Sequence, residues 1–431
     1  MSGPFDGITV VEFGQFVVVP FCAQLLADAG ARVIKVEPVS GDPYRAWPDQ
    51  LAPGETRQFL TRNRGKESIA IDLANPRSRD VVQALVGKAD VVLVNLSPAA
   101  VRRRRLDYES ISALNPRVVY GAVSAFGHVG PEAGLPGMDV VVQARSGLLS
   151  SLAAEEDGLP HHSEVQVADY VTAIMLFGGI AAALYVREHT GRGQRVDASL
   201  LGGALAIQNN ALAHVYGADD DWRREFVGVQ LPQLRERAAV RAEIEQVRRA
   251  LCPDTPVYTA HYRTFRTANG VIAVGAGSPA TRDRLIEMTG VEGELLDADP
   301  AAFRAQLASV FLTRTTAEWV AELRARDIPV AEVRHVEEML FDPHLEAEGL
   351  VADFEHELVG RYRGLGAPFR MSATPLRARA ASPPFARHTA GLLAELGFTD
   401  EQVAQLCADG AVVSLQSLAT DELPAPLRQG T

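Results

Sequence analysis

The first 125 residues alternate short apolar runs with longer amphipathic segments. Apolar runs bounded by polar or turn residues predict strands at 8–13, 32–38, 68–72, 90–96 and 117–123. Apolar residues at helical spacing predict helices at 20–31, 78–89 and 108–115. Strands that alternate with helices form a largely parallel sheet covered on both faces. We therefore predict a Rossmann-like α/β domain.

The middle of the chain is dominated by long apolar segments. A loop-rich stretch, 127–139, precedes a predicted helix at 140–153. The uncharged run 170–186 is slightly shorter than the ~18 residues that indicate a membrane span, and it contains Gly178-Gly179 and three consecutive alanines. These small residues favour a helix buried in the protein core, which we expect to end at Gly191. The stretch 196–216 predicts another mostly apolar helix.

The pattern changes after residue 216. Residues 217–255 are strongly charged at helical spacing, which predicts a linker or an exposed insertion. A smaller α+β domain is predicted at 256–335, with Asn269-Gly270 as a hairpin turn. Residues 336–431 predict a return linker and a C-terminal part of the large domain, with two amphipathic helices at 387–412. The large domain, 1–216 and 336–431, is then built from both chain ends.

Composition and charge exclude some classes of function. A chain of 431 residues predicts about two domains, and 47% apolar with 22% charged residues is typical of an ordered soluble protein. The net charge of −12 disfavours nucleic-acid and membrane partners. The three cysteines match no disulfide or zinc spacing, and the N-terminus shows no secretory signal. We expect a cytoplasmic protein without a metal site.

The first βαβ unit invites a dinucleotide-binding interpretation, because Glu37 ends the second strand where an acidic residue can hold a ribose. The turn after the first strand argues against it. That turn reads GQFVVVPF, with one glycine followed by bulky valines, whereas a pyrophosphate needs glycines for close backbone approach. No P-loop, HExxH or GxSxG pattern is present either.

Two basic segments lie next to predicted strands, one after the strand at 90–96 and one before the strand at 68–72. Arginines occupy positions 102–105, and the stretch TRNRGKES contributes Arg62, Arg64 and Lys66. These residues are either solvated helix faces or a binding site for the phosphates of an anionic ligand, for which arginine offers a bidentate fork. Two basic segments beside one sheet favour the anionic ligand.

Asp169, in the stretch SEVQVADYVTA, has two interpretations. It is an N-cap whose side chain accepts hydrogen bonds from the start of the helix, or a carboxylate nucleophile kept ionised by the helix N-terminus beside an apolar wall. Position alone leaves both open. His161 and His162, in the loop before it, are either exposed loop residues or substrate contacts.

Several stretches together resemble the class III CoA-transferases, the family of formyl-CoA transferase and carnitine CoA-transferase. They are GITVVEF, CAQLLADAGARVIKVEPVSGDP, NRGKESIAIDL, ADVVLVNLSPAAVRR, LNPRVVYGAVSAFGHVGP, VADYVTA, GGIAAALYVREHTGRGQRVDASLL, DPHLEAEGLV and HTAGLLAELGFTDEQV. The resemblance covers nearly the whole chain, and it lies in the order and spacing of these stretches.

The resemblance implies that Asp169 is the catalytic nucleophile. It would attack an acyl-CoA thioester to give an aspartyl-acyl anhydride and then an aspartyl-CoA thioester, which a carboxylic acid acceptor resolves. CoA is then a substrate and no cofactor is tightly bound. The resemblance also implies an interlocked homodimer. Its CoA contacts and neighbouring acidic residue carry over to Val17, Lys66, Asn95, Leu96, Ser97, Arg103 and Asp139.

Two alternatives to transfer remain at this point. The related α-methylacyl-CoA racemases resemble PGHDxxxxAxSG, with histidine as an acid/base group, whereas this chain reads PGMDVVVQARSG. Met138 carries a thioether, which cannot move a proton, so the racemase interpretation is disfavoured. A CoA-binding protein without catalysis would keep the basic segments but would have no need for Asp169.

The chain departs from the family pattern at three places. Val18-Val19 replaces the usual Ala-Gly before the proline of the first turn. The glycine-rich flap of formyl-CoA transferase has no counterpart in 252–265, and the segment 217–255 has no obvious counterpart at all. The fit around the pantetheine arm and the acyl pocket therefore stays open.

Overall fold

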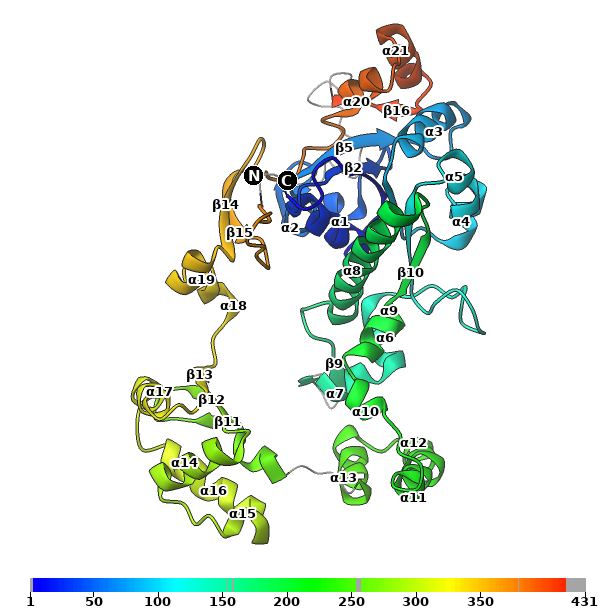
Figure 1. Ribbon diagram of the computed structural model, residues 1–431. Coiled ribbons are helices and arrows are strands. Elements are labelled where there is room, and N and C mark those ends of the chain that lie inside the picture. Colours follow the sequence, from blue (N-terminus) through cyan, green and yellow to red (C-terminus); the bar gives the residue numbers. More distant parts are fainter. Residues whose placement is uncertain (1–2, 153, 157–158, 253–256, 379, 416–431) are drawn as a thin grey trace. The chain divides into compact units, whose positions relative to one another are not determined.

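The computed structural model describes residues 3–152, 154–156, 159–252, 257–378 and 380–415. They form two compact units (Figure 1): the described residues of Met1–Ala213 and Asp342–Thr431 form the larger unit, and those of His214–Phe341 the smaller one. The large unit is thus built from both parts of the chain, as predicted. The described residues of 217–255 fall within the smaller unit.

A seven-stranded sheet lies at the centre of the large unit, in the order β10-β7-β6-β1-β2-β5-β16. All neighbours are parallel except β16, which pairs antiparallel with β5. The runs are rich in Val and Ile because both faces of a parallel sheet are buried. The strands are β1 Thr9–Phe13, β2 Arg32–Glu37, β5 Lys66–Ile71, β6 Val91–Val94, β7 Val119–Ser124, β10 Arg195–Ser199 and β16 Val412–Val413.

The prediction of one helix over 196–216 is wrong. Its beginning belongs to β10, where the polar Arg195 and Asp197 alternate with Val196 and Ala198, which pack against the core. This period of two is that of a strand with one buried face. The rest forms two short helices, α9 Leu200–Ala206 and α10 Asn209–Leu212.

Helices cover both faces of the sheet (Figure 1). Successive residues of β1 point to opposite faces of the sheet: Val10 belongs to one buried apolar cluster and Val11 to the other. The first cluster includes residues of α1 Val18–Asp28, α8 Val167–Thr190 and α9. The second includes residues of α3 Arg79–Gly87, α5 Tyr108–Leu114, α20 Thr389–Glu395 and α21 Asp400–Ala408.

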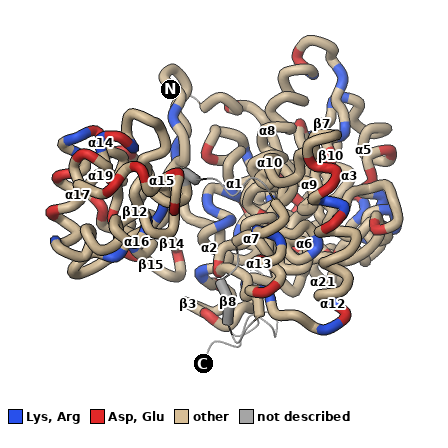
Figure 2. Tube along the Cα trace, turned by 90° about the horizontal axis from the view of Figure 1, so that it is seen from below, with Lys and Arg blue, Asp and Glu red and all other residues tan. Residues whose placement is uncertain are grey.

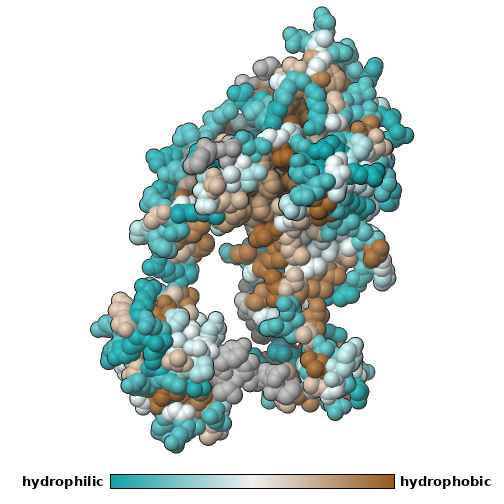
Figure 3. All heavy atoms as spheres, viewed as in Figure 1, coloured by the Kyte–Doolittle hydropathy of each residue, from teal (hydrophilic) through white to brown (hydrophobic). Residues whose placement is uncertain are grey.

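The long helix α8 ends as predicted at Gly191, which adopts φ 71°. The prediction that α8 is buried in the core is only half right. Leu176 and Ile180 face the core, but the opposite side leaves Ile174 55% and Tyr185 67% exposed. Figure 3 shows hydrophobic surface where Figure 1 places α8 and α9. Length and composition alone would also let α8 cross a membrane, a test that core helices pass too.

The C-terminal part of α8 is anchored beneath the sheet. The Arg187 guanidinium, near the end of α8, forms an ion pair with Asp90, the residue just before β6 (Nη1 to Oδ1, 2.9 Å). The other carboxylate oxygen of Asp90 accepts the backbone N–H of Thr9 at 2.9 Å. One carboxylate therefore joins the helix to the first strand.

Shorter elements complete the large unit. The predicted helix at 140–153 is broken by Gly147, whose φ of 81° ends the first piece. The helices are α2 Arg57–Asn63, α4 Pro98–Arg103, α6 Asp139–Ser146, α7 Leu148–Leu152 and α19 Pro343–Glu348. The paired strands are β3 Gln50–Ala52 with β4 Glu55–Thr56, β8 Ala154–Glu156 with β9 Leu159–His161, and β14 Val351–His356 with β15 Gly360–Leu365.

The smaller unit contains a three-stranded antiparallel sheet and a separate core around Phe303, Phe311 and Trp319. The hairpin predicted at Asn269-Gly270 is confirmed, because β11 and β12 pair across it. Figure 2 shows Lys and Arg interspersed with Asp and Glu along both units. The elements are β11 Tyr262–Arg266, β12 Val271–Gly275, β13 Val330–Glu332, α11 Asp220–Arg223, α12 Leu231–Glu236, α13 Arg241–Leu251, α14 Pro279–Thr289, α15 Leu295–Ala298, α16 Pro300–Phe311, α17 Thr316–Ala325 and α18 Val336–Met339.

Candidate active site

Asp169 is the third residue of α8, so of its two interpretations the one that makes it the N-cap is wrong. The N-cap is Gln166, and its side chain makes no capping hydrogen bond. The backbone N–H of Asp169 instead donates to Asp139 Oδ1 at 3.0 Å. Asp139 is the first residue of α6, and its other carboxylate oxygen accepts from Gln143. The two aspartates singled out in the sequence therefore meet at one helix start.

The environment of Asp169 opposes its ionisation. Only 9% of the residue is exposed, and burial raises the pKa of its carboxyl to about 7, with a further contribution from the negative charge of Asp139. The Arg62 guanidinium acts in the opposite direction. Burial thus acts against the helix start, which we expected to favour the ionised form of Asp169. A carboxyl with this pKa exists in both protonation states near neutrality.

Apolar and aromatic side chains form a wall next to Asp169. Val17 is buried against Tyr44 and Phe59, with Tyr170 packed against the same cluster. The ring of Phe21, from α1, meets that of Tyr170 edge-on at 4.9 Å. Val17, a predicted CoA contact, lies in the same cluster as Tyr170, the residue after Asp169, and this apolar wall suits a site from which water is excluded.

The loop after β1 is tied to the loop after β6. Asn95 accepts the backbone N–H of Gln15 at 3.0 Å and donates its amide to the carbonyl oxygen of Gln15 at 2.7 Å. The chain leaves β1 toward β2 on one side, and β6 pairs on the other. This is a topological switch point, where open α/β sheets bind ligands at the carboxyl ends of their strands.

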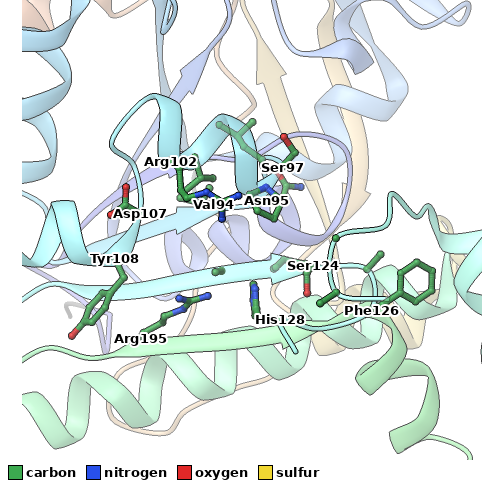
Figure 4. Close-up of a pocket in the computed structure, with 18 of the residues that line it drawn as sticks. Val94, Asn95, Ser97, Arg102, Asp107, Tyr108, Ser124, Phe126, His128 and Arg195 are labelled. Atoms are coloured by element: carbon green, nitrogen blue, oxygen red, sulfur yellow. The ribbon is translucent and has the colours of Figure 1, made fainter. Parts of the chain in front are cut away.

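A cavity of about 410 Å³ opens beside this point (Figure 4). The predicted residues Asn95, Leu96 and Ser97 line it, together with Ser124 and Phe126 after β7. Its wall continues to Gly137, two residues before Asp139. A side chain at Gly137 would collide with Ala125, because a Cβ there lies 2.6 Å from the Cβ of Ala125. The close approach of these loops therefore requires glycine.

Sequence reasoning missed several polar residues of this cavity, among them three with basic side chains. Arg102, His128 and Arg195 line it, and Figure 4 shows them around the same space. His128 and Arg195 share one carboxylate oxygen of Asp197, at 2.9 and 2.8 Å. The run of arginines at 102–105 indicated Arg102 only as one of a group. Arg195 was not singled out, because β10 was not recognised and Arg195 lies just before the predicted helix at 196–216.

Two predicted CoA contacts lie elsewhere. Lys66 is buried, and its ammonium donates to Glu12 Oε2 (2.7 Å), the carbonyl of Pro20 (2.8 Å) and Asn63 Oδ1 (2.8 Å). Burial lowers the pKa of Lys66 to about 8, against the effect of Glu12. All three of its protons are thus engaged within the protein. Arg103 is exposed and lines a different cavity, together with Arg104 and Arg105.

The other residues considered in the sequence are accessible. Met138 is the N-cap of α6 and is 54% exposed. His161 and His162 are exposed, with ring centroids 4.9 Å apart. Among the described residues, no group of three or more His, Cys, Asp and Glu side chains is arranged to hold a metal ion. The stretch 252–265, without a glycine-rich flap, lies partly outside the described residues.

Comparison with known proteins places this geometry in a family. The sequence model of CoA-transferase family III matches residues 5–389. The chain belongs to this family. The succinate–glutarate CoA-transferase of Agrobacterium fabrum is 32% identical over 410 residues, which cover 91% of this chain and 96% of that protein. A formyl-CoA:oxalate CoA-transferase of Rhodopseudomonas palustris is 30% identical over 438 residues, covering 98% and 100%.

Solved structures of the family share the fold. A crystal structure of a CaiB/BaiF family protein from Brucella suis matches with a TM-score of 0.70 at 28% identity, covering 92% of this chain and 100% of that one. A Mycobacterium tuberculosis protein matches with a TM-score of 0.73 at 25% identity, covering 91% and 99%. As a family III CoA-transferase, this enzyme acts on CoA thioesters.

Proposed function

We propose that this enzyme moves CoA from an acyl-CoA donor to a carboxylic acid acceptor, with Asp169 as the nucleophile. The observation that carries the proposal is a buried carboxylate at the start of α8, joined through its backbone N–H to Asp139 at 3.0 Å. Its pKa of about 7 supplies the ionised form at neutral pH and keeps it more basic than an ordinary carboxylate. Greater basicity favours attack on a thioester carbonyl.

The proposed reaction conserves the energy of the thioester. A carboxylate oxygen of Asp169 attacks the thioester carbonyl, the C–S bond breaks, and an aspartyl-acyl anhydride and CoA thiolate result. The thiolate then attacks the aspartyl carbonyl, releasing the donor carboxylate and leaving an aspartyl-CoA thioester. An acceptor carboxylate reverses the two steps and restores Asp169. Water would hydrolyse either intermediate, and the wall of Val17, Phe21 and Tyr170 supports its exclusion.

We assign CoA to the switch point of the sheet. Asn95, Leu96 and Ser97 line the cavity there, and Arg102 and Arg195 add guanidinium groups suited to phosphates. Val17 and Asp139 belong to the Asp169 end of the site. Contacts of Lys66 and Arg103 with CoA stay predictions: Lys66 is engaged by Glu12, Pro20 and Asn63, so its support of the site would be structural.

Racemisation needs an acid/base group, and this chain has none at position 138, where the related racemases have histidine. The thioether of Met138, at the start of α6, carries no transferable proton.

An interlocked homodimer is part of the proposal. The outer side of α8 exposes Ile174, Met175 and Tyr185, a large apolar face that a second copy would cover. Light scattering should give twice the chain mass for the wild type, and Ile174→Glu should shift it toward one chain mass. An unchanged dimer in that variant would contradict this assignment of the face. The free thiols of all three cysteines accord with the predicted cytoplasmic location.

The experiment is chemical trapping of the intermediates. Incubation with a panel of acyl-CoA donors should add CoA to the peptide that contains Asp169, or make its carboxyl reducible by borohydride, as seen by mass spectrometry. Asp169→Ala should abolish exchange and labelling while the circular dichroism spectrum is retained, and Asp80→Ala, an exposed control, should keep both. Full exchange with an unmodified Asp169 peptide would overturn the mechanism. Deuterium incorporation at the α-carbon without CoA transfer would favour the racemase instead.

A further inference from the structure

Arg62 is a buried cation without a carboxylate partner. It is 5% exposed, and no ion pair joins it to any residue in the described part of the chain. The other three buried arginines there are all paired, namely Arg45 with Glu37 and Glu55, Arg64 with Asp28, and Arg187 with Asp90. An unpaired buried charge costs free energy that an anion would offset. Arg62 is therefore suited to binding an anionic ligand, in addition to any structural role.

The hydrogen bonds of Arg62 leave its Nε without a partner among the described residues. Nη1 donates to the carbonyl oxygen of Gln58 at 2.9 Å and to its side chain at 2.6 Å. Nη2 donates to Gln166 Oε1 at 3.3 Å, and Nε is buried without a partner. In Arg45 the corresponding Nε and Nη2 atoms donate to the two carboxylate oxygens of Glu37 at 2.7 and 2.9 Å. On the same edge of Arg62, Nε is unpartnered and Nη2 makes only a long hydrogen bond to the Gln166 side chain, so no carboxylate of a described residue is held there.

This edge lies next to the proposed nucleophile. Gln166, which accepts from Arg62, is the N-cap of the helix that carries Asp169. The guanidinium carbon is 5.6 Å from the ring centroid of Tyr170 and 5.2 Å from that of Tyr44. The charge of Arg62 also lowers the pKa of Asp169 against the effect of burial. Arg62 thus influences Asp169 without forming an ion pair with it.

We infer that Arg62 is a specificity-determining residue that binds a second carboxylate on the acyl group, so that the enzyme favours CoA thioesters of dicarboxylic acids. The inference rests on the proposed function. A planar guanidinium binds a carboxylate through two parallel hydrogen bonds, and burial protects that pair from solvent. Acylation of Asp169 removes its negative charge while Arg62 stays positive, so the attraction for the acyl carboxylate is strongest in the covalent intermediates.

The test compares thioesters of equal chain length that differ in one terminal carboxylate. The pairs are malonyl-CoA with propionyl-CoA, succinyl-CoA with butyryl-CoA, and glutaryl-CoA with valeryl-CoA. The readout is the single-turnover rate at which Asp169 acquires its CoA adduct. The wild type should favour the carboxylate-bearing member of at least one pair at least about tenfold, and Arg62→Lys and Arg62→Gln should reduce that preference about 10- to 100-fold, the factor for losing a charged hydrogen bond.

A control variant and two contrary results separate the failure of this inference from the failure of the proposed function. Arg57→Lys, an exposed residue at the start of the same helix α2, should leave the preference unchanged. No preference in the wild type for any pair, or equal slowing of both members by the Arg62 variants, would overturn the inference and leave the transferase intact. No adduct on the wild type with any thioester would overturn the transferase proposal itself. If Arg62→Gln does not fold, the preference measured for Arg62→Lys, which retains the positive charge, tests the inference.

Discussion

Replacement of Asp169 by Asn is expected to remove activity and to stabilise the protein at neutral and alkaline pH. The carboxylate of Asp169 accepts no hydrogen bond from a described residue, so the isosteric amide loses no described contact. Burial raises the pKa of this carboxyl from 3.8 to about 7. The folded state therefore penalises the ionised form, and Asn cannot ionise.

The size of the effect follows from this pKa difference. A shift of about 3 pKa units, at about 1.4 kcal/mol each, corresponds to about 4 kcal/mol of stability that the wild type lacks once Asp169 is ionised. Because the folded pKa lies above the unfolded one, wild-type stability is complete below about pH 4 and falls as the pH rises through about 7. The variant escapes this loss. For 431 residues that unfold together, the difference corresponds to about 4 °C in Tm.

Thermal unfolding of both proteins between pH 4.5 and 8.5 checks the prediction. The Tm of Asp169→Asn minus that of the wild type should be small at the acid end, grow through pH 6 and level off above pH 7.5. Asp107→Asn is the control of opposite sign, because Asp107 caps α5 by accepting the N–H of Ser110 and its pKa is lowered. A pH-independent difference, or a variant less stable than the wild type at pH 8, would refute the reasoning.

Three further predictions concern activity and packing. Adduct formation at saturating acyl-CoA should rise with pH through about 7, since only ionised Asp169 attacks; a rate that stays flat between pH 5.5 and 8 in stopped-flow trapping would contradict this. Gly203→Ala should cost about 1–3 kcal/mol in urea unfolding, because its Cβ would lie 2.3 Å from Thr172 Oγ1, whereas Gly87→Ala meets no atom within 4 Å. Asn95→Ala should raise the KM for acyl-CoA about tenfold with little change in kcat, because it frees the loop at Gln15; an unchanged KM would exclude that role.

The parts of the fold that could be predicted are those encoded by local pattern. Short Val-rich runs identify β1 and β6 because both faces of these strands are buried. Gly191 identifies the end of α8 because the left-handed conformation favours glycine. In contrast, β10 is only five residues long and runs directly into the apolar helix that begins at Leu200, so the helical pattern concealed it.

Candidate site residues could be named from the sequence, but their geometry could not. The resemblance pointed to Asp139 and Asp169, yet their hydrogen bond joins positions 30 residues apart, and no periodicity encodes it. In the sequence Lys66 is a candidate CoA contact, and only the packed structure shows the carboxylate of Glu12 beside it. The pKa of Asp169 depends on burial by several segments, which is a tertiary property.

The ion pair that anchors α8 beneath the sheet lets residues far from Asp169 affect the position of its carboxylate. Asp169 and Arg187 are 18 positions apart (187 − 169) in one 24-residue helix, about 27 Å at 1.5 Å per residue. A tilt of about 2° about the pair of Arg187 with Asp90 would displace Asp169 by about 1 Å, a shift that can cost on the order of 100-fold in rate. Selection for new substrates should therefore enrich changes around Asp90 as well as in the acyl pocket.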